Sequence, residues 1–304
     1  MNVIWIKDGN VGHEKQVKVL LNELLKSQDL VIDERSIKGF IPFFRYIDHI
    51  ENKKYDIIIG AGHRTYSFLL DIKKSQKNET KTIAVLAPSI KRNKFDIICA
   101  PEHDKKKLDG CNEVITFEGS LSKVSFADPD MNTILIGIGG KNKHYTFDSE
   151  HLLSQIHYFL SINPNKKCYI FNSRRTPSLF TNELRFLDEK NKDITFCDFK
   201  NHSISFEDIL HKSSSKLISR DSVNMIYESL SCRGNTYLLD MESKKQNNKI
   251  VRNINNLIIN KKVGYIDCNN LIEGMSKMKI CKQNEFNEVF AEVEKVAFKL
   301  NKIL

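Results

Sequence analysis

The chain has 304 residues, of which 40% are hydrophobic and 28% are charged. This is the composition of a folded globular protein, and it excludes a disordered chain. No apolar run approaches the roughly 20 residues that a membrane-spanning helix needs. The net charge of +9 at pH 7 favours anionic partners, including a phosphate-bearing ligand and an anionic membrane surface. We expect no specific nucleic acid, because the aromatic and basic spacing of a nucleic-acid-binding module is missing.

The cysteines and the first residues indicate the compartment. Seven cysteines are scattered along the chain, and none of them forms a C-x-x-C pair. An odd, unpaired set is typical of reduced thiols, and it argues against a zinc site. Residues 1–9 lack a basic leader and a small-residue cleavage site, so they are predicted to form a strand rather than a signal peptide. We therefore expect a cytoplasmic protein, with peripheral attachment to the inner membrane as a further option.

In the first part of the chain, short β-branched runs alternate with amphipathic segments. The amphipathic segment at 13–26 predicts a helix, because Val17, Leu20 and Leu24 recur at helical spacing. Alternation of this kind predicts a parallel sheet with helices on both faces. The strands are expected at residues 2–6, 31–36, 56–60, 81–86, 96–99 and 113–116.

The same alternation begins again after residue 130. Strands are expected at 133–138, 167–171, 193–198, 215–218 and 235–239, and helices at 149–160, 222–232 and 285–304. The last helix carries an apolar stripe formed by Phe286, Val289, Phe290, Val293, Val296 and Ala297. We therefore predict an α/β fold of two Rossmann-like domains, residues 1–130 and 131–304, facing a cleft. The terminal helix is assigned to the second domain, with packing back as an option. Ligands of such sheets bind beyond the carboxyl ends of the strands.

Two glycine-containing loops are predicted at the carboxyl edge of the first sheet. The first contains Asp8, Gly9, Gly12, His13 and Glu14, and the second contains Gly62, His63 and Arg64. The glycines of the first loop allow backbone N–H groups at a helix N-terminus to approach an anion. Its histidine can exchange a proton near neutral pH, whereas its glutamate needs a raised pKa to do so. Helix capping and an ordinary strand-to-helix turn are the alternative interpretations.

Two loops of the second domain combine small residues with cations. They contain Gly139, Gly140 and Lys141, and then Ser173, Arg174 and Arg175. The first is similar to a phosphate cradle, although it lacks the spacing of a P-loop. Paired arginines suit a phosphate or carboxylate through bidentate hydrogen bonds. A solvated basic turn is the alternative.

A third loop of the second domain leads into a helix. Asp221 or Ser222 is expected to cap that helix, whose first N–H groups would bind a phosphate. Glu228 follows about two turns later, where its carboxylate could accept both hydroxyls of a ribose. A cap followed by an exposed glutamate is the alternative interpretation.

These loops, taken together and in this order, resemble the mitochondrial-fission family named for the plant "elongated mitochondria" protein, which has many bacterial members. The resemblance covers nearly the whole chain. The layout is also similar to the GT-B glycosyltransferases of the cell envelope. In those enzymes an N-terminal glycine-rich loop with a histidine or an acid faces the acceptor. A C-terminal helix N-terminus and a glutamate hold the phosphate and ribose of the donor.

The resemblance implies transfer of a sugar from a nucleotide-sugar donor to a hydroxyl of an envelope glycan or lipid, without a cofactor. His13 would be the general base, with Glu14 as the alternative, and Glu228 would hold the ribose. Lys141, Arg174, Arg175 and the helix that starts at Ser222 would stabilise the departing phosphate. Asp128 and Asp130 form a D-x-D pattern, but they lie in the predicted linker, so no metal is expected. A non-catalytic adaptor, or a nucleotide-sugar epimerase or hydrolase, remains as an alternative.

Overall fold

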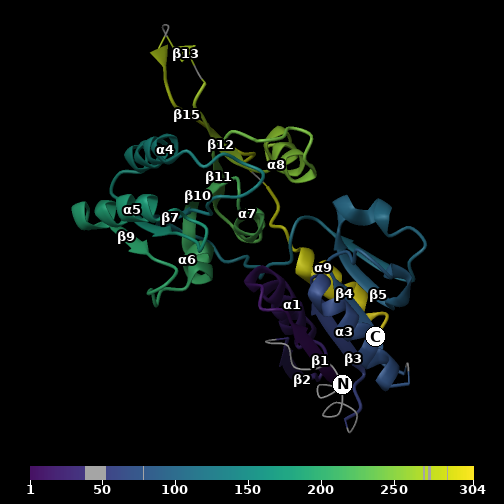
Figure 1. Ribbon diagram of the computed structural model, residues 1–304. Coiled ribbons are helices and arrows are strands. Elements are labelled where there is room, and N and C mark those ends of the chain that lie inside the picture. Colours follow the sequence, from purple (N-terminus) through teal and green to yellow (C-terminus); the bar gives the residue numbers. More distant parts are fainter. Residues whose placement is uncertain (38–52, 78, 270, 273–274, 286) are drawn as a thin grey trace. The chain divides into compact units, whose positions relative to one another are not determined.

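The computed structural model describes the whole chain except residues 38–52, 78, 270, 273–274 and 286 (Figure 1). Phe286, which belongs to the expected apolar stripe, therefore lies outside the described residues. The chain divides into two compact units. Unit 1 comprises Met1–Lys123 and Ala291–Leu304, and unit 2 comprises Val124–Phe290. This division differs from the predicted one, which placed residues 124–130 in the first domain and 291–304 in the second.

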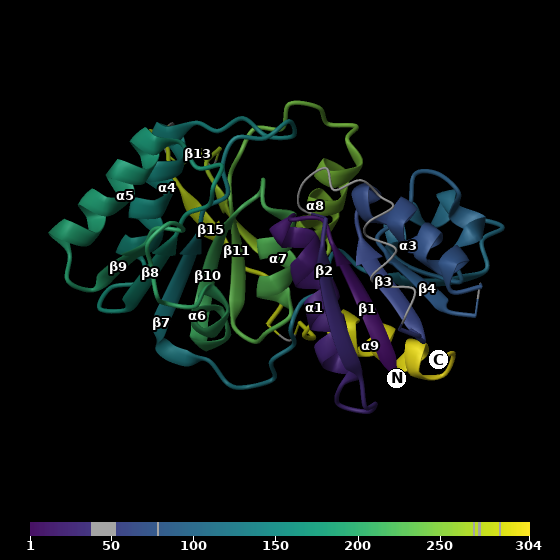
Figure 2. The same cartoon turned by 60° about the horizontal axis from the view of Figure 1, so that its bottom comes forward.

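Unit 1 is a parallel sheet of six strands in the order β2-β1-β3-β4-β5-β6 (Figures 1 and 2). All of the strands expected from the sequence in this part of the chain are present. The strands are β1 (Asn2–Lys7), β2 (Val31–Ser36), β3 (Ile57–Ala61), β4 (Lys81–Val85), β5 (Ile97–Pro101) and β6 (Glu113–Phe117). The helices are α1 (Val11–Leu24), α3 (His63–Ser75), α9 (Glu292–Asn301) and the 3-10 turns η1 (Arg92–Lys94) and η2 (Glu102–Lys107).

Unit 2 is a sheet of seven strands in the order β15-β12-β11-β10-β7-β8-β9, in which only β15 is antiparallel to its neighbour. Its strands are β7 (Asp130–Gly137), β8 (Lys167–Phe171), β9 (Ile194–Cys197), β10 (Ser213–Ser219), β11 (Asn235–Leu239), β12 (Gly264–Asp267) and β15 (Lys279–Cys281). The short strands β13 (Leu271–Ile272) and β14 (Met275–Ser276) pair separately. Its helices are α4 (Ser149–Ser161), α5 (Ser178–Lys190), α6 (Phe206–Lys212), α7 (Val223–Leu230) and α8 (Lys249–Ile259).

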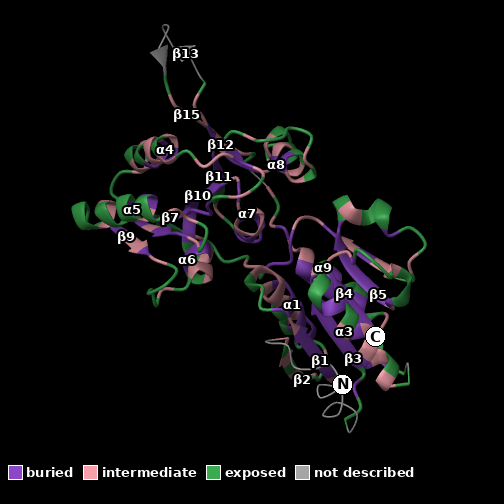
Figure 3. Cartoon of the chain, viewed as in Figure 1, coloured by how far each residue is buried: buried purple, intermediate pink, exposed green. Residues whose placement is uncertain are grey.

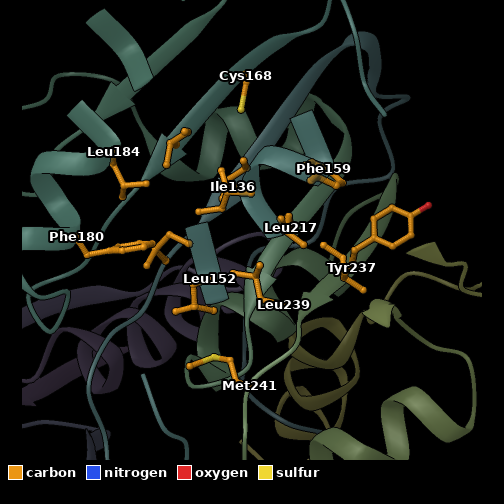
Figure 4. Packing of buried hydrophobic residues seen from close by; sticks show 14 of the residues in the cluster. Ile136, Leu152, Phe159, Cys168, Phe180, Leu184, Leu217, Tyr237, Leu239 and Met241 are labelled. Atoms are coloured by element: carbon orange, nitrogen blue, oxygen red, sulfur yellow. The ribbon is translucent and has the colours of Figure 1, made fainter. Parts of the chain in front are cut away.

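Alternation along β7 explains how the second sheet is buried on both faces. Ile134 and Ile136 join one apolar cluster, whereas Leu135 joins the other. Helices α4 and α5 cover the first face through side chains such as Phe159 and Phe180 (Figure 4). Helices α6 and α7 contribute to the second cluster. The central strands of both sheets are accordingly buried (Figure 3), as doubly wound sheets require.

Both sheets reverse their strand order beside the first strand of the unit. In unit 1, β1 lies between β2 and β3, and in unit 2, β7 lies between β8 and β10. At such a switch point, the loops that leave the two central strands turn to opposite faces of the sheet and open a crevice. The loops after β1 and β3, and those after β7 and β10, therefore hold the candidate site residues of each unit.

The prediction of one helix over 285–304 is wrong in its first part, since α9 begins only at residue 292. The N–H of Phe290 donates to the carbonyl of Leu230 at 2.9 Å, and its ring joins the core of unit 2. Val293 and Val296 are instead buried in α9, which packs on α1 and β6 of unit 1. The apolar stripe thus serves two cores, and this explains why the chain returns to unit 1.

A buried lysine anchors helix α7 to the second sheet. Lys216, in the middle of β10, is completely buried. Its ammonium donates to the carbonyls of Ser229 at 2.7 Å and Arg233 at 2.8 Å, at the C-terminal end of α7. Burial lowers the pKa of Lys216, while the helix dipole favours a cation at this end. The opposite end of α7 is consequently held at the carboxyl edge of the sheet.

Within the described residues, no helix is both long and apolar enough to cross a membrane.

The carboxylate of Asp96 links three elements of unit 1. It accepts hydrogen bonds from the Lys73 ammonium at 2.6 Å and from the Thr82 N–H and hydroxyl, both at 2.8 Å. Burial alone would raise the pKa of Asp96, but these hydrogen bonds and the charge of Lys73 lower it overall. A carboxyl group with a lowered pKa stabilises the folded state above its unfolded pKa, near 3.8, and loses this effect as pH falls through the folded value.

We expect Asp96→Asn to lower the free energy of unfolding of unit 1 by about 1–2 kcal/mol at pH 7. The loss should shrink as pH falls below about 3.8, because the carboxyl group of the unfolded wild type then binds a proton before that of the folded protein does. Urea unfolding at pH 7 and pH 3 measures both values. Asp71→Asn is the control, since Asp71 lies 3.7 Å from the exposed ammonium of Lys74 in a solvent-accessible pair. An equal loss at both pH values would contradict the role of the charge.

Candidate functional site

In unit 1, the loop after β1 forms a histidine–aspartate pair. Nδ1 of His13 lies 2.9 Å from Oδ2 of Asp8, whose side chain is almost completely buried. Asn10 caps helix α1 by accepting from the N–H groups of Gly12 and His13, so the imidazole is not needed as a cap. An aspartate on Nδ1 fixes the ring orientation and leaves Nε2 to face a substrate.

The loop after β3 closes against this pair. Gly62 has a φ of +88°, and a Cβ at this position would lie 2.3 Å from Nδ1 of His13 and 2.9 Å from Oδ2 of Asp8. Only glycine fits both the backbone conformation and the space. Two loops that were singled out from separate parts of the sequence therefore meet in one cluster. The side chains of His63 and Arg64, which begin α3, are exposed.

The structure gives Glu14 a different part from the expected reserve base. Its Oε1 accepts the N–H of Gly9 at 2.8 Å, and its Oε2 lies 3.5 Å from the ammonium of Lys7. These contacts close the loop before α1. Of the two candidate bases, His13 has the geometry of a proton acceptor.

In unit 2, the carboxylate of Asp221 ties three loops together. It accepts the N–H of Gly140 at 2.8 Å and the hydroxyl of Ser219 at 2.7 Å, and it lies 2.9 Å from the guanidinium of Arg175. The side chain has no exposed area. Burial raises the pKa of Asp221, while these donors and the arginine favour the ionised form. Asp221 therefore holds the loops after β7, β8 and β10 together rather than contacting a ligand.

The two glycines after β7 are required by close packing. A Cβ on Gly139 would lie 2.2 Å from Asp221, and one on Gly140 would lie 2.1 Å from the backbone of Arg175. The N–H of Gly139 donates to Ser219 at 2.7 Å, and that of Gly140 donates to Asp221. The prediction that this loop forms a phosphate cradle is therefore corrected, because both N–H groups already donate to side chains of the protein.

Some cations of the neighbouring loops pair with carboxylates of the protein, and others are exposed to solvent. Arg175 pairs with Asp221, and the hydroxyl of Ser173 donates to the carbonyl of Gly139 at 2.5 Å, so both stabilise the loop. Arg174 and Lys141 are exposed, and their side chains make no hydrogen bond or ion pair within the described part of the chain. Of the cations proposed for phosphate binding, only these two are free to meet a ligand.

Helix α7 presents an uncapped N-terminus at the same edge. Ser222 occupies the N-cap position, but its side chain forms no capping hydrogen bond. The N–H groups of Val223, Asn224 and Met225 have no acceptor within the described residues. Unpaired N–H groups and the positive end of the helix dipole make this turn suited to an anion. Ser222 is thus at the N-cap position, as the sequence predicted, but its side chain does not cap the helix.

Glu228 is not the exposed residue of the alternative interpretation. Only 8% of it is accessible, and it lies on α7 near Cys232, whose thiol pKa its charge raises in part. Glu228 lies in the C-terminal half of α7, the helix whose N-terminus is uncapped. Its role towards a ribose remains a prediction.

A pocket of about 440 Å³ lies beside the start of α7, and sequence reasoning missed most of its lining. Arg220 and Tyr145 line it. Nε of Arg220 and the hydroxyl of Tyr145 are buried without a hydrogen-bond partner in the described chain. Tyr145 is only 2% exposed, and burial raises its pKa to about 12, so the hydroxyl stays protonated. Buried polar groups are normally satisfied, so both groups point to a polar ligand.

The lining of the pocket combines the cation Arg220 with the carboxylates of Asp148, Asp240 and Glu242, and it contains potential metal ligands. Burial and the charges of Lys143 and Arg175 lower the pKa of His144, so this imidazole is neutral at pH 7. His151 and Asp240 line the pocket and lie with Cys268 in one cluster. Burial and nearby carboxylates raise the pKa of the Cys268 thiol to about 11. Arg220 directly precedes Asp221, but no local signal in the sequence links it to the other residues that line the pocket.

We expect Asp221→Ala to destabilise unit 2 by about 2–4 kcal/mol, because it leaves the buried N–H of Gly140 and the buried hydroxyl of Ser219 without their acceptor. The adjacent Ser222→Ala should cost less than about 0.5 kcal/mol, since that side chain forms no capping hydrogen bond. Denaturant unfolding of both variants measures the difference. A large loss for Ser222→Ala and none for Asp221→Ala would restore the roles predicted from the sequence.

Comparison with solved structures places the fold. The UDP-GlcNAc 2-epimerase from Methanocaldococcus jannaschii has a TM-score of 0.55 at 12% identity, covering 99% of this chain and 100% of that one. The UDP-GlcNAc 2-epimerase from Neisseria meningitidis has a TM-score of 0.55 at 13% identity, with coverages of 99% and 92%. E. coli ADP-heptose LPS heptosyltransferase II has a TM-score of 0.50 at 12% identity, with coverages of 100% and 98%. At these identities the likeness concerns the fold alone.

The family comparison is more specific. No curated protein sequence matches the chain. The family model described as Mitochondrial fission ELM1 matches residues 11–299, from the first turn of α1 into α9. The match thus includes strands of both sheets and every loop of unit 2 described above. The chain therefore belongs to the mitochondrial fission ELM1 family.

Proposed function

We propose that this protein is a glycosyltransferase that moves a sugar from a nucleotide-sugar to a hydroxyl of a cell-envelope glycan or lipid. One observation carries the proposal: at the switch point of unit 2, the loop that leads into an uncapped helix N-terminus also contributes Arg220 to a polar pocket. The N–H groups of residues 223–225 suit a diphosphate. Arg220 and Tyr145 offer hydrogen bonds to the neutral part of the same ligand.

The ligand class follows from the chemistry of these donors. A diphosphate carries negative charge, which a helix N-terminus stabilises. Two exposed cations, Lys141 and Arg174, belong to the loops that Asp221 holds together, and they can pair with the same charge. A pocket of about 440 Å³ is within the size of small-ligand sites, and its buried donors suit hydroxyl or carbonyl oxygens. The structurally similar proteins named above are, by their names, enzymes of nucleotide-sugars. Nucleotide-sugars are therefore the first compounds to test.

The Asp8–His13 pair of unit 1 supplies the base in this proposal. Nε2 of His13 takes the proton of the acceptor hydroxyl as its oxygen attacks the anomeric carbon, and the donor diphosphate leaves with the electron pair. Asp8 on Nδ1 stabilises the imidazolium that forms. A lipid acceptor would bring the protein to the inner membrane surface, and a net charge of +9 would favour that surface when it is anionic.

We expect a nucleoside diphosphate or its sugar ester to raise the melting temperature of the full chain, and Arg220→Ala to weaken binding about tenfold to a hundredfold. The expected loss arises because Arg220 is the cation that lines the pocket. Scanning fluorimetry against UDP, ADP, GDP and their sugar derivatives identifies the ligand, and calorimetry measures the affinity. Arg174→Ala and Glu228→Ala test the two other predicted contacts.

Arg233→Ala is the matched control for Arg220→Ala, because Arg233 precedes β11 at the opposite edge of the same sheet. It should bind the nucleotide as the wild type does. A wild-type protein that no nucleotide stabilises would support the adaptor alternative instead. Release of the nucleotide or a change in the sugar without any acceptor would support an epimerase or hydrolase.

We expect His13→Gln to lower the rate of sugar transfer about 10²–10⁴-fold with donor affinity unchanged, because the base is lost and the donor contacts are not. Glu14→Gln should have a much smaller effect, since its carboxylate closes the loop. The assay follows transfer from the stabilising donor to an envelope glycolipid fraction. If Glu14→Gln abolished transfer and His13→Gln did not, the assignment of the base would be reversed.

A further inference from the structure

Three side chains of unit 2 converge at the wall of the pocket. They are His151 in the first turn of α4, Asp240 directly after β11, and Cys268 directly after β12. One nitrogen, one oxygen and one sulfur atom of these residues all lie within 4.8 Å of one another. The absence of a C-x-x-C pair speaks only against zinc ligands that are close together in the sequence. These three stand on separate elements, so their meeting becomes visible only in the fold.

The spacing of the histidine and aspartate donor atoms suits a tetrahedral metal ion, and the cysteine sulfur lies within 4.8 Å of both. Bonds of about 2.0–2.3 Å to nitrogen, oxygen and sulfur place neighbouring ligand atoms roughly 3.3–3.7 Å apart. Nε2 of His151 lies 3.4 Å from Oδ2 of Asp240. Imidazole, carboxylate and thiolate together form a donor set that zinc accepts, whereas magnesium and calcium prefer oxygen alone.

A buried glutamine holds two of these residues in place. Gln155 is completely buried on α4. Its amide nitrogen donates to the carbonyls of His151 at 3.2 Å and Asp240 at 3.0 Å, and its amide oxygen accepts the N–H of Asp240 at 2.6 Å. The backbones that carry the imidazole and the carboxylate are therefore fixed relative to each other before any ion binds. Preorganisation of this kind is what a built metal site requires.

The two oxygens of Asp240 have different partners. Oδ2 faces His151, while Oδ1 lies 3.2 Å from the guanidinium of Arg220. A metal ion on Oδ2 leaves the arginine contact intact, and arginine then orients the ligating carboxylate from outside. Asp267 precedes Cys268 in the chain, and its negative charge at the thiol opposes the positive charge of Arg220 there.

We propose that His151, Asp240 and Cys268 bind a zinc-type divalent cation through Nε2, Oδ2 and Sγ. The thiol proton passes to solvent when Sγ bonds to the metal. Three protein ligands leave one tetrahedral position, and because His151 and Asp240 line the pocket, that position faces its interior. The cation would then coordinate an oxygen of whatever polar molecule the pocket holds.

Cobalt(II) substitution tests the site directly, because a cobalt–thiolate bond produces a charge-transfer absorption in the near ultraviolet. The full chain, without an affinity tag and stripped of metals, is titrated with Co²⁺ in a thiol-free reductant. We expect one equivalent to produce the thiolate band and tetrahedral d–d bands in the visible, and one equivalent of Zn²⁺ to remove both. Cys268→Ser should abolish the thiolate band, and His151→Gln and Asp240→Asn should weaken binding at least tenfold.

Cys281→Ser is the matched control, since Cys281, like Cys268, is a partly exposed cysteine of unit 2 that forms no disulfide. It should keep the band. The proposal is overturned by a wild-type protein that develops no thiolate band, or by a band that survives Cys268→Ser. Zn²⁺ should also raise the melting temperature of the wild type but not that of Asp240→Asn, which separates metal binding from a loss of folding. Neither readout depends on nucleotide binding, so the two proposals fail independently.

Discussion

A single buried carboxylate determines the carboxyl edge of the second sheet. Asp221 holds the N–H of Gly140, the hydroxyl of Ser219 and the guanidinium of Arg175, so three loops become one rigid rim. Because the N–H groups of Gly139 and Gly140 are used within the rim, the unpaired backbone N–H groups that an incoming anion meets in the described loops lie at the start of α7. The ammonium of Lys216 fixes the other end of that helix, and the direction of α7 is thereby set from both ends.

Strand order explains why the candidate residues of each unit lie where they do. Loops after neighbouring strands part at a switch point, and both units place their glycine-containing loops there. In unit 1 this brings Gly62 against the Asp8–His13 pair. In unit 2 it brings Arg220 and the uncapped turn of α7 next to a pocket. One topological rule thus places an imidazole–carboxylate pair at the switch point of one unit and an uncapped helix N-terminus at that of the other.

The sequence could predict the two-part α/β class, the loops that matter and the strands of both sheets except β12 and β15. Each of the predicted features has a local signature: a β-branched run, or a glycine at a strand end. It could not separate residues that bind a ligand from residues that bind each other. Asp221, Arg175 and Glu14 have the right chemistry for a ligand site, yet their partners are distant in sequence or in the loop itself. The same limit hid Tyr145 and the convergence of His151 with Cys268. The apolar stripe near the C-terminus predicts one helix, because hydrophobic spacing does not reveal which core each side chain enters.

A crystal structure of the full chain with the nucleoside diphosphate that stabilises it most tests the central claim directly. The account predicts the diphosphate on the N–H groups of residues 223–225, with its neutral part in the pocket against Arg220 and Tyr145. The amides of Gly139 and Gly140 should still donate to Ser219 and Asp221. A diphosphate bound instead by the two glycine amides, with the Asp221 carboxylate displaced from them, would contradict the account.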